Sequence, residues 1–131
     1  MYRVFKTRNF ARWLKRSELT DAALFKAVQE MVSGLIDADL GGDIVKKRVA
    51  LPGRGKRAGA RTLIATRRSH RWIFVFGFDK NERSNISQSD LEILQTLAED
   101  LLDRTDSEID ESLSDNSLQE IFCGNETQSK K

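Results

Sequence analysis

The basic side chains best suited to chemistry lie in one run of the chain, from Lys46 to Arg61, where Arg and Lys are interspersed with Gly. The planar fork of arginine and the ammonium group of lysine donate hydrogen bonds that suit phosphate oxygens, and glycine lets the backbone approach a ligand closely. The run begins as an apolar-basic stretch typical of a strand and ends in an alternating one, so its middle predicts a cationic loop between two strands. We interpret this loop as a polyanion site. A solvated loop without a ligand is the alternative.

Charge is divided unevenly along the chain. Residues 1–88 carry 19 Lys and Arg against 8 Asp and Glu, a net charge of +11, whereas residues 89–131 carry 3 against 12, a net charge of −9. Such a split predicts a nucleic-acid-binding body followed by an acidic tail. We expect the acidic side chains of the tail either to be solvated or to fold back on the basic body.

The elements that must position the loop are predicted from apolar periodicity and capping residues. Their β-α-α-β-β-β-α order predicts an α+β fold with a mostly antiparallel sheet, two N-terminal helices and a C-terminal helix. In chain order we expect a strand at Tyr2–Lys6, a helix from Thr7 or Asn9 to Arg16, a helix capped by Thr20, strands at Asp43–Leu51, Ala60–Arg67 and Arg71–Phe78, and a helix started by Ser87 or Ser89.

The strand at Arg71–Phe78 is apolar on both faces, which predicts a central position in the sheet. The short connection Arg68–His70 predicts a tight hairpin, so this strand and the preceding one should be antiparallel neighbours. Strict alternation would place the aromatic residues of the strand together on one face, and we expect them to belong to the core: Trp72, Phe74, Phe76 and Phe78.

The last part of the chain differs in composition from the rest. Residues 104–131 are acidic, rich in Ser and Asn and sparse in apolar side chains, so we expect a folded domain at 1–103 and a mostly disordered tail at 104–131, with one short helix around Ser117–Phe122. Cys123 is the single cysteine, which excludes an intrachain disulfide and a cysteine-based zinc site. Because the sequence shows neither a signal peptide nor the roughly 20 apolar residues of a membrane span, we expect a cytoplasmic protein without a membrane partner.

Three segments follow one another in a characteristic order: Asp39–Gly42 leading into Val45–Val49, then Pro52–Arg61, then Phe76–Ile86. In this order they resemble the RelE/ParE superfamily of toxins from bacterial type II toxin–antitoxin pairs, most closely the RelE and HigB type, over roughly residues 2–103. The resemblance implies a RelE-like fold and cleavage of mRNA in the ribosomal A site, although the ParE branch inhibits DNA gyrase instead. It also implies a cognate antitoxin, of helix-turn-helix type and encoded by a neighbouring gene, besides the ribosome and mRNA as partners.

RNA cleavage by attack of the 2′-hydroxyl needs a proton acceptor, a group that stabilises the pentavalent phosphorus dianion and a donor to the leaving 5′-oxygen. The resemblance implies essential cations at Lys56, Arg61 and Lys80, which we predict to be catalytic. Other residues are predicted to contact RNA: Arg54, Arg57, Arg83, Lys46, Lys47, Arg48 and His70.

One departure from the family pattern bears on mechanism. The family motif usually reads Gly-Lys-Ser-Gly-Gly-Tyr-Arg, and Ala60 stands here at the tyrosine, which shifts proton transfer to Lys56, Lys80 or His70. The basic body contains no clustered set of His, Cys, Asp and Glu ligands, so the leading prediction is a metal-independent endoribonuclease without a cofactor. The alternative is a non-catalytic basic module that binds RNA or the ribosome, or inhibits DNA gyrase.

Overall fold

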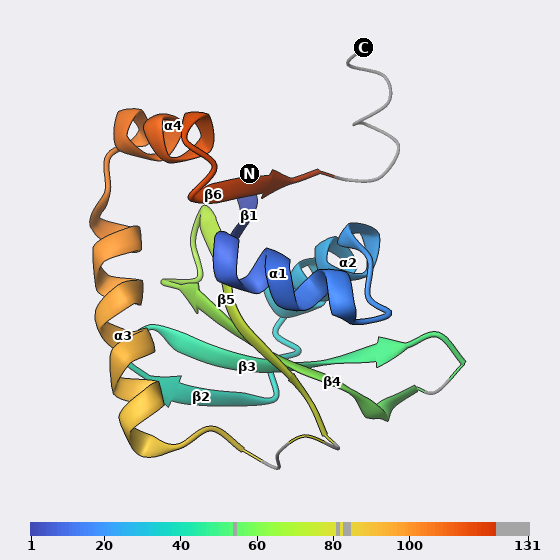
Figure 1. Ribbon diagram of the computed structural model, residues 1–131. Helices are drawn as coiled ribbons and strands as arrows, with labels where there is room; N and C mark the ends of the chain where they lie inside the picture. Colours follow the sequence, from blue (N-terminus) through green and yellow to red (C-terminus); the bar gives the residue numbers. More distant parts are fainter. Residues whose placement is uncertain (54, 81, 83–84, 123–131) are drawn as a thin grey trace.

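The computed structural model describes residues 1–53, 55–80, 82 and 85–122, with only the backbone described at residues 56–58. Its helices and strands have the α+β composition expected from the sequence (Figure 1). In chain order they are β1 Arg3–Thr7, α1 Arg8–Arg16, α2 Asp21–Val32, β2 Ala38–Gly41, β3 Ile44–Leu51, β4 Gly55–Thr66, β5 Arg71–Asp79, α3 Gln88–Asp103, α4 Asp106–Ser114 and β6 Leu118–Ile121.

The described strands form one six-stranded sheet in the order β2-β3-β4-β5-β1-β6. Each described strand pairing is antiparallel except that of β1 with β5, whose registers match Arg3 with Arg71 and Lys6 with Phe74. The expected hairpin between β4 and β5 is confirmed. β5 lies inside the sheet, as its two apolar faces predict.

The two faces of the sheet are covered by different helices. Buried residues of α1 and α2 pack with one face in a first apolar cluster, and buried residues of α3 and α4 pack with the other face in a second. The predicted caps are confirmed, because the hydroxyls of Thr7, Thr20 and Ser87 accept hydrogen bonds from backbone N–H groups in the first turns of α1, α2 and α3. The helices are thus fixed by local sequence, and the sheet between them carries the loops.

A bulge in β5 overturns the expected alternation of its aromatic residues. Ile64 of β4 pairs with Phe74, but the next residue, Leu63, pairs with Phe76, so Val75 is an extra residue in β5. Phe74 belongs to the first cluster, whereas Val75 and Phe76 both pack against the second. Beyond the bulge the faces are exchanged, because two successive side chains point to the same side.

Gly77 lets α1 lie directly on the strand beyond this bulge. A Cβ atom at this position would lie 2.5 Å from the ring of Trp13, far closer than van der Waals contact permits. The indole therefore occupies the space that a side chain would fill. The close approach positions the exposed basic side of α1 above the end of β5.

The expectation of a mostly disordered segment from residue 104 onward is wrong for residues 104–122. Thr105 caps α4 with a capping box, Ile109 is 0% exposed, and β6 pairs with β1 as the last strand of the sheet. The helix expected around Ser117–Phe122 is a strand instead. Apolar side chains spaced too sparsely to suggest a core on their own, Ile109, Leu118 and Ile121, are sufficient to dock the segment. Residues 123–131 lie outside the described part of the chain.

Candidate functional site

The register of β3, β4 and β5 gathers the predicted catalytic positions at one end of the sheet, which we call the open end. Ala60 pairs with Asp79 and Arg61 pairs with Phe78, so the residues preceding Ala60 and those following Asp79 lie side by side. Lys56 is in β4 on the loop side of Ala60, and Lys80 directly follows β5. The hairpin therefore places Arg61 beside the end of β5 that leads into Lys80, whereas Lys56 lies four residues beyond Ala60, where β4 pairs with β3.

Arg61 lies in β4 at the same level as Arg48 of β3. It is half-buried, and its Nη1 donates a hydrogen bond of 3.0 Å to the carbonyl oxygen of Gly59. This bond ties the side chain to the backbone of the strand that carries Lys56. Arg61 also faces Arg48 across the β3–β4 pair, so two guanidinium groups leave the same face of the sheet.

Arg48 is held by Asp37. The Arg48 Nε donates to Asp37 Oδ1 at 2.9 Å, and the backbone N–H of Arg48 donates to Asp37 Oδ2 at 2.7 Å. Burial by itself would raise the pKa of Asp37, but these two hydrogen bonds outweigh it and hold that pKa below its ordinary value. Arg48 is thus oriented toward β2, whereas half-buried Lys46 makes no ion pair with a described residue.

Lys80 is exposed and makes no ion pair within the described residues. The turn that carries it is fixed by Glu82, whose carboxylate accepts from the Asp79 N–H at 3.2 Å and whose own N–H donates to the Asp79 carbonyl at 3.0 Å. The Oδ1 atom of Asp79 is buried and accepts no hydrogen bond from the described part of the chain. Sequence reasoning missed Asp79, whose signal was its position between a buried strand and a lysine.

Two of the predicted RNA contacts are placed elsewhere. The Lys47 side chain is only 3% exposed, and its ammonium group lies 2.9 Å from Glu30 Oε1 and donates to the Leu35 carbonyl at 2.8 Å. It faces the α2 side and ties that helix to β3, so its ammonium group is engaged inside the fold, and its role toward RNA stays a prediction. His70 is exposed in the turn between β4 and β5, at the opposite end of the sheet from Lys80.

The remaining predicted positions are known only in part. Arg54 and Arg83 lie outside the described residues, and Lys56 and Arg57 have described backbone in β4 but no described side chain. The backbone of Lys56 and Arg57 lies in the part of β4 between Gly55 and Ala60, on the loop side of the strand. Their roles stay predictions.

The buried position of Ala60 shows where a tyrosine side chain at this position would point. Its side chain is 0% exposed and belongs to the cluster formed with α1 and α2, on the face opposite Arg61. Because neighbouring residues of a strand point to opposite faces, a larger side chain at this position would enter the core rather than join Arg61. The departure from the family motif therefore alters core packing at this place in β4.

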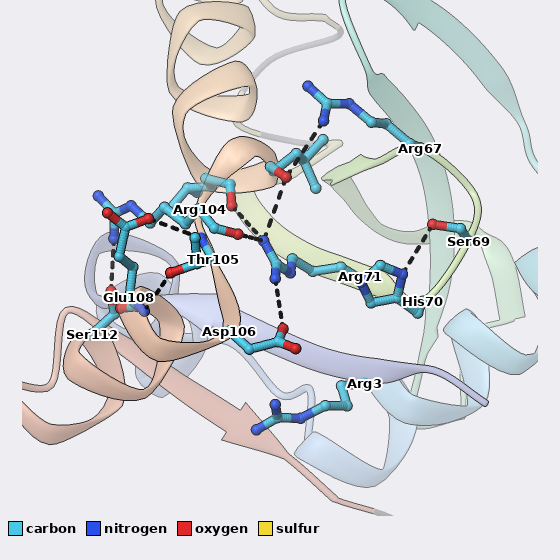
Figure 2. Close-up of polar contacts among 12 residues, drawn as sticks. Arg3, Arg67, Ser69, His70, Arg71, Arg104, Thr105, Asp106, Glu108 and Ser112 are labelled. Atoms are coloured by element: carbon cyan, nitrogen blue, oxygen red, sulfur yellow. Dashed lines mark hydrogen bonds and ion pairs between the residues drawn. The ribbon is translucent and has the colours of Figure 1, made fainter.

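The other end of the sheet, which we call the closed end, holds a second group of arginines, of which Figure 2 shows Arg67 and Arg71, the latter next to Asp106. Arg67 pairs with Asp43 at 3.1 Å and with Asp103 at 2.9 Å, and Arg68 pairs with Asp39 at 2.9 Å. The hydrogen bonds of Arg67 to Asp103 and Asp43 raise the pKa of its guanidinium. The cations nearest the β4–β5 turn are therefore already engaged by carboxylates.

Arg71 is the buried member of this closed end. Its Nη1 donates to the carbonyl oxygens of Leu101 at 3.0 Å and Arg104 at 2.9 Å, and its Nη2 lies 3.2 Å from Asp106 Oδ1. These carbonyls end α3, where a cation complements the negative end of the helix dipole. A cleft of about 290 Å³ adjoins these residues. Side chains that line it already have partners within the protein: Arg67 donates to the Leu102 carbonyl, and Asp106 accepts from Arg71. This end fixes α3 and α4 to the sheet.

Metal ligation and membrane insertion find no support in the described part of the chain. No group of three or more His, Cys, Asp or Glu side chains is placed there to hold a metal ion. No described helix combines the length and the apolar character that crossing a bilayer requires.

Comparison with protein families gives one match over nearly the whole chain. A model of the family described as "RelE toxin of RelE / RelB toxin-antitoxin system" matches residues 2–121. The matched region includes α4 and β6 and so extends to the end of the described sheet. Comparison with curated proteins gives no match.

Proposed function

The chain belongs to the RelE toxin family, so it is the toxin of a toxin–antitoxin system with a cognate antitoxin, and we propose that it acts as a ribosome-dependent mRNA endonuclease. The observation that carries the proposal is the gathering of Arg61, Lys80 and the backbone bearing Lys56 at the open end of the sheet. The cations of the closed end are paired with carboxylates, whereas Lys80 has no such partner among the described residues.

The reaction at this site breaks the bond between phosphorus and the 5′-oxygen of the following nucleotide. The 2′-oxygen attacks phosphorus, its proton passes to a base, and the leaving 5′-oxygen takes a proton from an acid, which yields a 2′,3′-cyclic phosphate and a 5′-hydroxyl. Arg61, fixed by Gly59, donates to the non-bridging oxygens, where negative charge grows in the transition state. His70 lies too far along the hairpin to take part.

Proton transfer falls to the two lysines. An amine accepts a proton when it is neutral and donates one when it is charged, so lysine can serve in either role. One lysine acts as base toward the 2′-hydroxyl, and the other protonates the 5′-oxygen.

Induced expression with and without the neighbouring gene tests this function. Wild-type chain expressed alone should arrest growth, and primer extension should show breaks within translated mRNA. Arg61→Gln should abolish the breaks, whereas Arg68→Gln, a matched loss of one guanidinium at the closed end, should retain them. Growth arrest with intact mRNA would instead establish the alternative, a basic module that blocks the ribosome, RNA or DNA gyrase without cutting.

A further inference from the structure

Asp37 and Arg48 form a fixed pair at the edge of the sheet, just before β2 begins. The backbone N–H of Asp37 donates to the Lys46 carbonyl at 3.0 Å, which holds Asp37 against β3. The Asp37 carboxylate accepts two hydrogen bonds from Arg48, one from its backbone N–H at 2.7 Å and one from its Nε at 2.9 Å. The Asp37 side chain is only 21% exposed. Arg48 is therefore held by a carboxylate whose own place is set by a backbone contact.

The two oxygens of this carboxylate serve different purposes. The described pairing of β2 with β3 runs only as far as Ala38 and Lys46, so the N–H of Arg48 lies beyond it and donates to Asp37 Oδ2 instead. That bond completes the edge of the strand. The second bond, from Nε to Oδ1, adds nothing to the backbone but restricts the guanidinium group. Asp37 therefore orients a side chain as well as ending a strand pairing.

The outer part of the Arg48 guanidinium is available to a ligand. The Arg48 side chain is 44% exposed, and neither of its Nη atoms donates a hydrogen bond to a described residue. The two Nη atoms carry four N–H donors in one plane, a geometry that matches two oxygens of a phosphate. Asp37 thus occupies the inner donor of Arg48 and leaves the donors that suit phosphate.

Arg48 and Arg61 face each other across the β3–β4 pair, yet their side chains are drawn apart. Like charges directly opposite one another destabilise a strand pair. Arg48 is bonded to Asp37 on the β2 side, whereas Arg61 is bonded to the Gly59 carbonyl on the loop side at 3.0 Å. Two guanidinium groups that are separated in this way suit two successive phosphates of one strand better than a single phosphate.

We propose that Arg48 binds the RNA phosphate next to the scissile one, and that Asp37 is the positioning residue that orients Arg48 for this contact. Asp37 itself does not touch RNA. Because its carboxylate restricts the guanidinium before RNA arrives, less side-chain freedom is lost on binding. The inference rests on the proposed function in taking RNA as the ligand and Arg61 as the group on the scissile phosphate.

Binding to RNA that cannot be cleaved tests the contact apart from the nuclease reaction. The probe is a ribosome programmed with mRNA whose A-site codon carries 2′-deoxynucleotides, which lack the attacking hydroxyl. Arg48→Gln in the full-length chain should weaken binding by about tenfold. It should also reduce the slope of log association constant against log salt concentration by about 0.7, the value for one phosphate contact on a single strand. Unchanged affinity and slope would overturn the inference.

Asp37→Asn separates positioning from simple charge. Removal of a negative charge close to an RNA site by itself tightens binding, whereas loss of the contact that orients Arg48 weakens it. We expect Asp37→Asn to weaken binding to the same probe by about fivefold. The matched control is Asp39→Asn, which removes the carboxylate that pairs with Arg68 at 2.9 Å and should leave binding unchanged or slightly tighter. Equal or tighter binding in Asp37→Asn would refute the positioning role.

A double-mutant cycle excludes a merely structural role. Arg48→Gln retains the backbone N–H that donates to Asp37, so in that background Asp37→Asn should change binding by no more than about twofold. A loss of the same size in both backgrounds would show that Asp37 only completes the strand edge, and would overturn the inference.

Cleavage kinetics separate this inference from the proposed function. With cleavable mRNA, Asp37→Asn and Arg48→Gln should raise KM and leave kcat within about twofold, because a phosphate beside the reacting one is bound equally before and during the reaction. A fall in kcat at unchanged KM would place Arg48 on the scissile phosphate and refute the assignment. The predicted binding losses together with uncut wild-type mRNA would support the contact and refute the nuclease.

Discussion

The two ends of the central hairpin both carry cations, but the described cations have different partners. At the closed end, Arg67, Arg68 and Arg71 each meet a carboxylate within 3.2 Å. At the open end, Lys80 meets no carboxylate in the described residues. Basic composition alone therefore says little about function. A cation is available to phosphate only where the fold leaves it without a carboxylate.

The C-terminal segment contributes part of the difference. Two of its described carboxylates pair with the basic body near the closed end, while other acidic side chains of the segment are exposed to solvent. Asp106 reaches Arg71, and Glu120 pairs with Arg3 at 2.8 Å. The hydrogen bond with Glu120 raises the pKa of the Arg3 guanidinium. These two ion pairs connect the acidic C-terminal segment to the start of β1 and the start of β5.

The largest expected effect on stability lies at the closed end. Arg71→Met should lower the free energy of unfolding by about 3–5 kcal/mol, because it leaves the carbonyls of Leu101 and Arg104 without their donor in a buried place. Chemical denaturation measures the loss, and Arg71→Lys should recover part of it. A loss below about 1 kcal/mol would show that the bonds of Arg71 at the closed end do not stabilise the packing of α3 on the sheet, which would contradict the structural role given to this end.

A smaller effect is expected at Asp37, which engages Arg48 next to the open end. Asp37→Asn should lower stability by about 1 kcal/mol at neutral pH, since the charged hydrogen bonds are partly screened by solvent. Because folding lowers the pKa of Asp37, its contribution is present above the unfolded value of about 4 and is lost as pH falls through the folded value. Denaturation across pH 2–7 should show the two proteins converging in acid. A difference in the free energy of unfolding that stays constant across this pH range would contradict the pairing of Asp37 with Arg48.

The smallest effect is expected at His70. His70→Ala should change the free energy of unfolding by no more than about 0.5 kcal/mol, because the ring is exposed and its polar contact is with adjacent Ser69. mRNA breaks in cells should be as frequent as with wild-type chain. A loss of cleavage in a variant of unchanged stability would indicate that the closed end takes part in catalysis, and would contradict the structural role given to that end.

Local signals in the sequence predicted the helices and the hairpin well. Hydroxyl caps at Thr7, Thr20 and Ser87 fixed where helices begin, and the short connection at residues 68–70 fixed the antiparallel pairing. Elements that form only through contacts between residues far apart in the sequence were not predicted. β2 has four residues and gains its strand pairing from β3, and β6 exists because β1 offers an edge more than 110 residues away.

The candidate site was predictable in part for the same reason. The hairpin register follows from local sequence, so the meeting of the Lys56 and Lys80 segments could be expected. Side-chain partners could not, because the burial of Lys47 against Glu30 depends on where α2 packs. The bulge at Val75 was equally hidden, since an extra residue in one strand becomes visible only when the partner strand is known.

The central claim is that the open end performs the phosphate chemistry while the closed end is structural. Purified chain acting on mRNA-programmed ribosomes tests it with Lys80→Gln and Arg67→Gln, two exposed positions at which one positive charge is removed. We expect the single-turnover cleavage rate to fall by about 100-fold or more in Lys80→Gln and to stay within about twofold in Arg67→Gln. Equal rates in the two variants, or a greater loss in Arg67→Gln, would contradict the claim.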